Sequence, residues 1–219
     1  METEHQISGG QPEAEDRFLS AAEKKLLLRI ARQAVQEVVC NETGLQVRLE
    51  ELPERLRIPR AAFVTLTRKG DLRGCIGGLE ACQPLVLDVI EHAMAAARDD
   101  YRFYPVMPEE FDEIRIEISC LTPPRLLNYQ GGEDLVAKLR PGIDGLVLTD
   151  GFRRATFLPQ VWEKLPEVEQ FLGHLCLKMG VRADAWKSGK LKALVYEVEE
   201  FAEEEFVEDR DATGGEKSG

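Results

Sequence analysis

The sequence contains little histidine, no closely paired cysteines and no excess of positive charge. It has three histidines among 219 residues, and its five cysteines are widely spaced with no Cys-x-x-Cys pair. This pattern argues against a disulfide scaffold, a zinc ribbon and a self-contained radical-SAM cluster. No Walker loop, G-x-G-x-x-G fingerprint or His-Glu-x-x-His motif occurs. We therefore expect reduced thiols, no metal site and no cofactor.

Negative charge is concentrated at the two ends of the chain. The formal net charge is −12. Residues 1–16 hold five acidic and no basic residues, and residues 202–219 hold seven acidic and two basic ones, so each end carries −5 and residues 17–201 carry −2. Such ends are typical of solvated, disordered tails. We predict acidic disordered tails at 1–16 and 202–219 around one domain at 17–201. Nucleic-acid binding is disfavoured because the basic surface that phosphates require is missing.

Long hydrophobic runs are also absent. No apolar segment approaches the roughly 20 residues that span a bilayer. The first residues lack the basic and apolar regions of a signal peptide. We therefore expect a cytoplasmic protein that makes no contact with a membrane.

The apolar residues recur with two different periods along the chain. Helical spacing predicts helices at about 20–39, 84–98, 132–139 and 167–179. Strand-like composition or alternation predicts strands at 61–67, 114–120 and 193–201. Asp150-Gly151 joins two short predicted strands, 146–149 and 153–157, and predicts a hairpin with a type I′ turn. Strands that follow strands favour an α+β fold with a largely antiparallel sheet.

The stretch Leu72–Gly78, with the sequence LRGCIGG, has the composition of a functional site. It follows the predicted strand at 61–67 and a Lys69-Gly70-Asp71 turn, and three of its last five residues are glycine. Glycines permit unusual backbone angles and exposed amides. We therefore predict a glycine-rich loop in which Cys75 is the candidate catalytic nucleophile. Candidate substrate-binding residues on the loop are Arg73, Gly74 and Gly77.

A structural role for Cys75 is the alternative, because a free cysteine usually packs as a small buried hydrophobe. No base for the thiol is evident from the sequence. His5 lies in the acidic tail, His92 is expected with Asp88 on the polar face of its helix, and His174 faces away from the apolar stripe of its helix. A cysteine–histidine dyad requires the fold to bring His92 or His174 to Cys75.

The LRGCIG motif resembles the signature of the AMMECR-type domain, whose bacterial and archaeal members are called AmmeMemoRadiSam system protein A. The resemblance continues through five further segments and covers roughly residues 20–200: 100–105 (DYRFYP), 117–121 (EISCL), 142–146 (GIDGL), 157–161 (FLPQV) and 171–186. It implies two α+β subdomains enclosing a cleft, with LRGCIG at that cleft. We place a soft subdivision near 125–190. The resemblance implies no settled biochemical activity.

The same resemblance adds three candidate substrate-binding residues. Asp100 and Arg102 match its D-x-R-F segment, and Glu117 begins the EISCL segment on the polar face of a predicted strand. Arg73 is expected either to bind an anionic substrate group or to pair with a carboxylate, with Asp100 as the candidate partner, and so to orient two loops. Glu117 faces either solvent or the cleft.

Two functional hypotheses follow. In the first, the chain is an enzyme or enzyme component that uses the Cys75 thiol on an unknown small-molecule or protein substrate. The resemblance then implies an accessory role beside a Memo-like protein and a radical-SAM protein. In the second, the chain is a non-catalytic binding or adaptor module in which LRGCIG is a structural or docking loop.

Overall fold

The structure, a computed structural model, describes residues 18–41 and 43–205. Its strands are β1 (Ala62–Arg68), β2 (Asp71–Gly77), β3 (Ile114–Leu121), β4 (Arg125–Leu127), β5 (Gly145–Thr149), β6 (Arg154–Phe157), β7 (Lys192–Tyr196) and β8 (Val198–Ala202). Its α-helices are α1 (Ala21–Cys40), α2 (Glu54–Arg57), α3 (Leu85–Arg98), α4 (Gly131–Lys138) and α5 (Val168–Lys178). Short 3-10 helices are η2 (Leu49–Glu51), η3 (Pro108–Glu113), η4 (Pro159–Glu163) and η5 (Ala185–Ser188).

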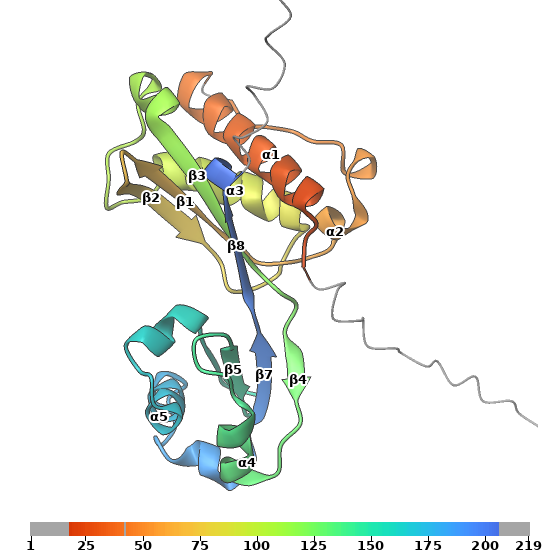
Figure 1. Ribbon diagram of the computed structural model, residues 1–219, viewed down its shortest axis with the longest axis vertical. Coiled ribbons are helices and arrows are strands. Elements are labelled where there is room, and N and C mark those ends of the chain that lie inside the picture. Colours follow the sequence, from red (N-terminus) through yellow and green to blue (C-terminus); the bar gives the residue numbers. More distant parts are fainter. Residues whose placement is uncertain (1–17, 42, 206–219) are drawn as a thin grey trace, which may run out of the picture.

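The strands form two four-stranded antiparallel sheets, which lie one above the other in Figure 1. The first sheet has the order β2-β1-β3-β8, and with α1, α2 and α3 it makes up the first lobe. The second has the order β4-β7-β5-β6, and with α4, α5, η4 and η5 it makes up the second lobe. The predicted α+β fold with antiparallel sheets is confirmed.

In the first lobe, α1 and α3 cover one face of the sheet (Figure 1). Alternate residues of β1 and β3 face these helices and are fully buried, among them Val64, Leu66, Ile116 and Ile118. Burying such side chains is the main stabilising contribution of a sheet face. The intervening residues of the same strands point to the opposite face, which turns toward the second lobe.

The second lobe has a separate aromatic core. The Trp162 ring stacks on Phe171, with centroids 3.6 Å apart and ring planes 3° apart. The indole Nε1 of Trp162 donates to the carbonyl of Asp144 at 2.8 Å, which satisfies the polar end of the ring. These contacts fix η4 against α5, so the segment that faces the first lobe is held in place.

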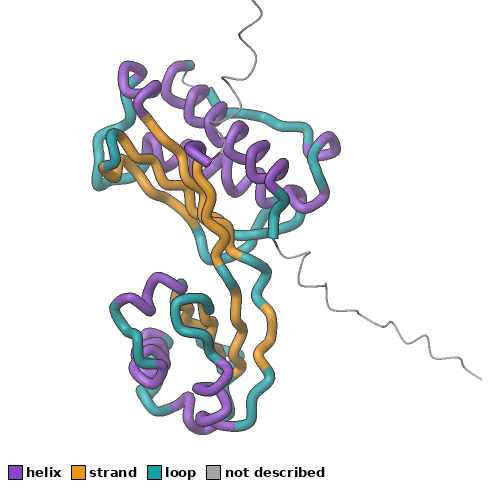
Figure 2. The backbone as a smooth tube through the Cα atoms, in the orientation of Figure 1, coloured by secondary structure: helices purple, strands orange, loops and turns teal. Residues whose placement is uncertain are grey.

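Two chain segments that lie side by side connect the lobes, and each of them contributes one strand to each sheet (Figure 2). β3 continues toward β4 and β7 toward β8, and β3 pairs with β8 while β4 pairs with β7. At the junction the amide of Thr122 donates to the carbonyl of Glu197, and the amide of Glu197 donates to Thr122 Oγ1, both at 2.8 Å. The predicted single strand at 193–201 is therefore divided at Glu197.

Two local predictions are wrong. The β5–β6 hairpin exists, but its connection is the four residues 150–153 and not a two-residue type I′ turn. Asp150 accepts from the amides of Phe152 at 3.0 Å and Arg153 at 2.7 Å, so its side chain organises a longer turn. Asp88, expected on the polar face of α3, is buried and accepts from the amide of Ala62 at 2.9 Å.

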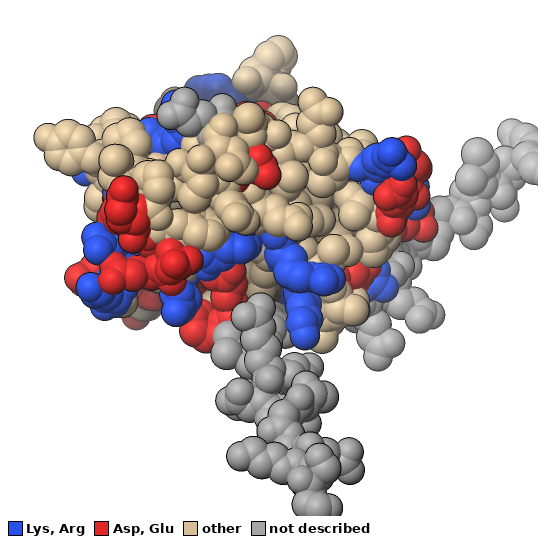
Figure 3. All heavy atoms as spheres, turned by 90° about the horizontal axis from the view of Figure 1, so that it is seen from above, with Lys and Arg blue, Asp and Glu red and all other residues tan. Residues whose placement is uncertain are grey.

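The predicted acidic tails lie mostly outside the described residues, as does His5. Residues 202–205 are described: Ala202 ends β8, and Glu203 accepts from Arg32 Nε at 2.8 Å. In the described part of the chain, no helix has the length and apolar character needed to cross a membrane. On the face of the molecule that Figure 3 shows, Lys and Arg side chains lie beside Asp and Glu side chains rather than forming a basic patch.

Candidate functional site

The LRGCIG motif forms strand β2, so the predicted glycine-rich loop is wrong. β2 pairs with β1 in an antiparallel register that sets Cys75 opposite Thr65 and Gly77 opposite Phe63. The glycines of the motif do not adopt positive φ angles. The left-handed positions are Lys69 (φ 56°) and Gly70 (φ 89°), which form the predicted turn between β1 and β2.

The glycines of β2 serve close packing. A Cβ atom on Gly74 would lie 2.1 Å from the carbonyl oxygen of Ala96, and one on Gly77 would lie 2.3 Å from the Phe63 ring. The missing side chains therefore allow α3 to approach one face of β2 and the Phe63 ring to cover the other. The amide of Cys75 itself is not free, because it donates to Asp100 Oδ2 at 2.8 Å.

Cys75 is half-buried on the sheet face that turns toward the second lobe. Thr65 Oγ1 lies 3.3 Å from Cys75 Sγ and donates to it. The thiol lines a cavity of about 530 Å³ between this face and η4. Residues from both lobes form its walls: Phe63, Thr65, Glu117, Ser119, Leu121, Val198 and Glu200 from the first sheet, and Leu158, Gln160, Val161, Glu163 and Lys164 from the second lobe.

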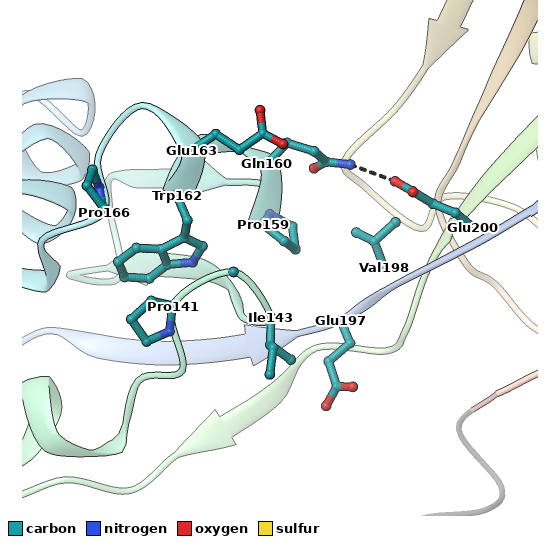
Figure 4. A pocket seen from close by; sticks show the side chains of 11 residues that line it. Pro141, Ile143, Pro159, Gln160, Trp162, Glu163, Pro166, Glu197, Val198 and Glu200 are labelled. Carbon is teal, nitrogen blue, oxygen red and sulfur yellow. Dashed lines mark hydrogen bonds between the residues drawn. The ribbon is translucent and has the colours of Figure 1, made fainter.

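A second cavity of about 590 Å³ adjoins the first and shares part of its wall (Figure 4). Gln160 Nε2 donates to Glu200 Oε1 at 2.9 Å, and Figure 4 shows this bond joining η4 to β8. The far end of the second cavity is lined by Pro141 and Trp162 (Figure 4). Together the two cavities form a cleft between the lobes that extends along β8.

Glu117 lines the same cavity as Cys75. Thr65 lies opposite Cys75 on one side and opposite Glu117 on the other, so the three side chains form one row across β2, β1 and β3. Burial raises the pKa of the Glu117 carboxyl above its ordinary value, and the nearby carboxylate of Glu200 acts in the same direction. The sequence left open whether Glu117 faces solvent or the cleft, and in the structure it faces the cleft.

Arg73 is held by protein groups outside this cavity. Its guanidinium donates to both carboxylate oxygens of Glu110, at 3.1 and 2.9 Å, and to the carbonyls of Tyr104 and Pro105. The Arg73 guanidinium lowers the pKa of Glu110 to about 2. The expected pairing of Arg73 with Asp100 is wrong. Arg73 instead ties β2 to the segment that precedes β3.

Asp100 and Arg102 support the backbone of Cys75. Asp100 is 3% exposed and accepts from Arg102 Nε at 2.8 Å as well as from the Cys75 amide. Arg102 Nη2 in turn donates to the Cys75 carbonyl at 3.1 Å. The Arg102 guanidinium holds the pKa of Asp100 well below its usual range. Both residues therefore position β2, and neither lines the Cys75 cavity.

The structure does not bring a histidine to Cys75. His92 lies on α3, which covers the opposite side of the sheet, with Nδ1 3.2 Å from Asp88 Oδ2. His174 is exposed on α5. Neither lines the Cys75 cavity, so no cysteine–histidine dyad forms among residues 18–41 and 43–205. Over the same residues, no group of three or more His, Cys, Asp or Glu side chains is placed to hold a metal ion.

Thr65 and Glu200 are polar residues of the cavity that sequence reasoning did not name as site candidates. Thr65 contacts the thiol, and Glu200 bonds across the cleft to Gln160. Thr65 alternates with the buried Val64 and Leu66, which marks it as lying on the other face of β1. That alternation is visible in the sequence, whereas the position of Glu200 depends on the pairing of β8 with β3.

Comparisons with known proteins agree with this fold. The AMMECR1 family model matches residues 28–201. A protein from Methanothermobacter thermautotrophicus is 38% identical over 187 residues, covering 85% of this chain and 97% of its own. One from Methanocaldococcus jannaschii is 37% identical, covering 86% and 94%. The crystal structure of an uncharacterized protein from Pyrococcus horikoshii superposes with a TM-score of 0.66 at 34% identity, covering 85% of this chain and 94% of that one. The chain belongs to the AMMECR1 family.

Proposed function

We propose that this chain is an enzyme, or the substrate-handling component of one, that uses the Cys75 thiol in the cleft between its lobes. The observation that carries the proposal is the position of Cys75 Sγ on the wall of a cavity of about 530 Å³, with the Thr65 hydroxyl 3.3 Å away. A cavity of this size accommodates a small molecule or a side chain. A half-buried thiol on a rigid strand is well placed to attack an electrophilic carbon.

The charges of the cavity point to a ligand that carries a positive group. Glu117, Glu163 and Glu200 contribute carboxylates, and Lys164 is the one Lys or Arg among the described lining residues. The raised pKa of Glu117 follows first from burial and then from neighbouring carboxylates. A bound amine would lower the pKa of Glu117 again, because an opposite charge nearby favours the ionised carboxylate.

Glu117 is the residue best suited to accept a proton during such a reaction. A carboxyl with a raised pKa is nearer to the operating pH, which makes it a more effective general base. Thr65 lies between Glu117 and Cys75 in the strand register. We place Cys75 as the nucleophile, Thr65 as the donor that supports the sulfur, and Glu117 as the proton acceptor on the ligand side.

Arg73, Asp100 and Arg102 enter this proposal as positioning residues, because their charged groups are bonded to protein atoms. Gly74 and Gly77 enter it through packing. A role beside a Memo-like protein and a radical-SAM protein is part of the proposal as well, and its support is the family resemblance alone. In such a system this chain would present or modify the small molecule.

Site-resolved alkylation of the folded protein tests the proposal. Each cysteine is followed by peptide mass spectrometry after treatment with neutral iodoacetamide, cationic 2-bromoethylamine or anionic iodoacetate. We expect Cys75 to react in the folded state and to favour the cationic reagent over the anionic one, relative to exposed Cys40 in the same molecule. Thr65→Val should slow the reaction at Cys75 while leaving Cys40 unchanged.

Charge variants distinguish the effect of the cavity carboxylates on this reagent preference from the effect of carboxylates elsewhere on the surface. Glu200→Gln should reduce the preference of Cys75 for the cationic reagent. Glu109→Gln, which removes an exposed carboxylate outside the cavity, should leave it unchanged. The proposal fails if Cys75 reacts only when the protein unfolds, or if its reagent preference equals that of Cys40.

A non-catalytic binding module is the second candidate. It is favoured by the histidine-free lining of the cavity and by the bonds that fix β2 through its backbone. Cys75→Ala separates the two candidates. A binding module retains its cellular function with alanine at this position, whereas the thiol-dependent enzyme loses it.

A further inference from the structure

Arg60 is a buried cation that has no carboxylate partner among the described residues. It lies before β1 and is 2% exposed. Its Nε donates to the Leu121 carbonyl at 3.1 Å, and its Nη2 has no acceptor. A guanidinium stays protonated at physiological pH. Burying an unpaired charge is strongly unfavourable, so buried arginines are normally matched by an anion. Among the described residues, Arg60 makes no ion pair that would supply this anion.

Arg60 lines a cavity of about 360 Å³ that is separate from the Cys75 cavity. The two cavities have only Leu121 in common among their lining residues. Residues 59–61 and 79–82 form one wall, and residues 121–124 form the connection between the lobes. The remaining wall comes from the second lobe.

The second lobe contributes another arginine to this cavity. Arg154, on β6, lines it together with Val147 and Tyr196. The Nη1 atom of Arg154 lies 3.4 Å from Glu80 Oε1, and both side chains are exposed. An exposed pair of this length contributes little to stability, so Arg154 can exchange Glu80 for a stronger partner. Two arginines, one before β1 and one on β6 of the second lobe, therefore line the same cavity.

We propose that this cavity binds a small anion-bearing molecule, with a carboxylate or phosphate group held by Arg60 and Arg154. Both anions match the planar fork of a guanidinium and accept paired hydrogen bonds from it. The walls are otherwise rich in apolar residues, including Pro59, Leu79, Pro123 and Val147, which suit a compact apolar body attached to the anionic group. The ligand would contact both lobes and supply the counter-charge that Arg60 lacks.

Binding of defined anions to the full chain tests this proposal. Inorganic phosphate, phenyl phosphate and benzoate are titrated by calorimetry, and thermal unfolding is followed at matched ionic strength in chloride. We expect saturable binding of at least one probe and a rise in Tm with its concentration, because a ligand that binds the folded state stabilises it. Preference for phenyl phosphate or for benzoate identifies the phosphate or the carboxylate as the natural group.

Three variants assign the binding to the cavity. Arg154→Gln changes an exposed side chain and should weaken binding roughly 10- to 100-fold, the usual value of a charge-assisted hydrogen bond. Arg60→Met keeps the side-chain volume and should abolish binding and the Tm response. Arg29→Gln removes an exposed arginine on α1 and should change neither. The proposal is overturned if none of the probes binds saturably, or if Arg154→Gln binds the preferred probe as tightly as the original chain.

Discussion

The backbone amide of Cys75 donates to Oδ2 of Asp100 at 2.8 Å, and this bond joins strand β2 to the segment after α3. Asp100 is buried and bound to Arg102, whose Nη2 returns to the carbonyl of Cys75 at 3.1 Å. The peptide groups on both sides of Cys75 are thus fixed by one ion pair. The orientation of the thiol in the cleft depends on a carboxylate outside the cleft.

Asp100→Asn is therefore expected to affect both stability and the thiol. Loss of the charged acceptor should lower the free energy of unfolding by about 1.5–3 kcal/mol, the range for hydrogen bonds to charged groups. Urea denaturation measures this change, and iodoacetamide kinetics at Cys75 should change with it. Asp99→Asn, at the neighbouring exposed position, is the matched control. Equal stability of the two variants would refute a supporting role for Asp100.

Two glycines of the stretch Leu72–Gly78 are expected to respond differently to alanine. Gly74→Ala would place a methyl group 2.1 Å from the Ala96 carbonyl oxygen, so α3 or β2 must move. We expect destabilisation of roughly 3 kcal/mol or failure to fold. In Gly78→Ala the methyl group meets only the His92 ring, at 3.6 Å from Cε1 and 3.9 Å from Nε2, and the change should be tolerated. Thermal unfolding compares the two, and similar Tm values would contradict the packing role of Gly74.

Acid sensitivity should follow from the pairing of Glu110 with Arg73. The Arg73 guanidinium lowers the pKa of Glu110 from 4.5 to about 2. Between these values the unfolded state binds more protons than the folded state, so this contribution to stability is full above about pH 4.5 and is lost as the pH falls toward 2. Glu110→Gln should flatten the dependence of unfolding free energy on pH in that window. Glu109→Gln, one residue away and exposed, should retain it.

Buried thiols should stay unmodified in the native protein. Burial raises the pKa of Cys120 to about 12, and burial also raises the pKa of Cys176. Because the thiolate is the reacting form, neither should be alkylated at pH 8 until the protein unfolds. Peptide mapping with and without denaturant measures this. Modification of Cys120 at the rate of exposed Cys82 in native buffer would show that the core opens.

Most helices and strands could be predicted from the sequence, but the geometry of the candidate site could not. Helical spacing located α1 and α5, and strand-like composition or alternation located β1 and β3, since these signals depend on neighbouring residues. The glycines of β2 suggested a loop, because the groups that require them, Ala96 of α3 and the Phe63 ring, are distant in the sequence. The prediction that Asp88 lies on the polar face of α3 was wrong for a similar reason. The partner of Asp88 is the amide of Ala62, which the apolar pattern of α3 does not reveal.

For the site residues too, the sequence identified candidates but not the contacts between them. Cys75 and Glu117 were both named from the sequence, but their relation depends on Thr65, the residue between them in the sheet register. Arg73, Asp100 and Arg102 were recognised as charged residues of a shared motif. Their partners were not predictable, because only the folded geometry pairs Arg73 with Glu110 and Arg102 with Asp100.

The paired strands that run through both sheets also set how far the lobes can move apart. A single-chain linker bends at low cost, whereas here two hydrogen-bonded segments must deform together, with Thr122 and Glu197 bonded to each other at the crossing. The width of the cleft is therefore coupled to the local twist of this ribbon. We therefore expect a substitution that removes the hydrogen bond of Thr122 to Glu197 to change the distance between the Cys75 face and η4, although Thr122 does not line the Cys75 cavity.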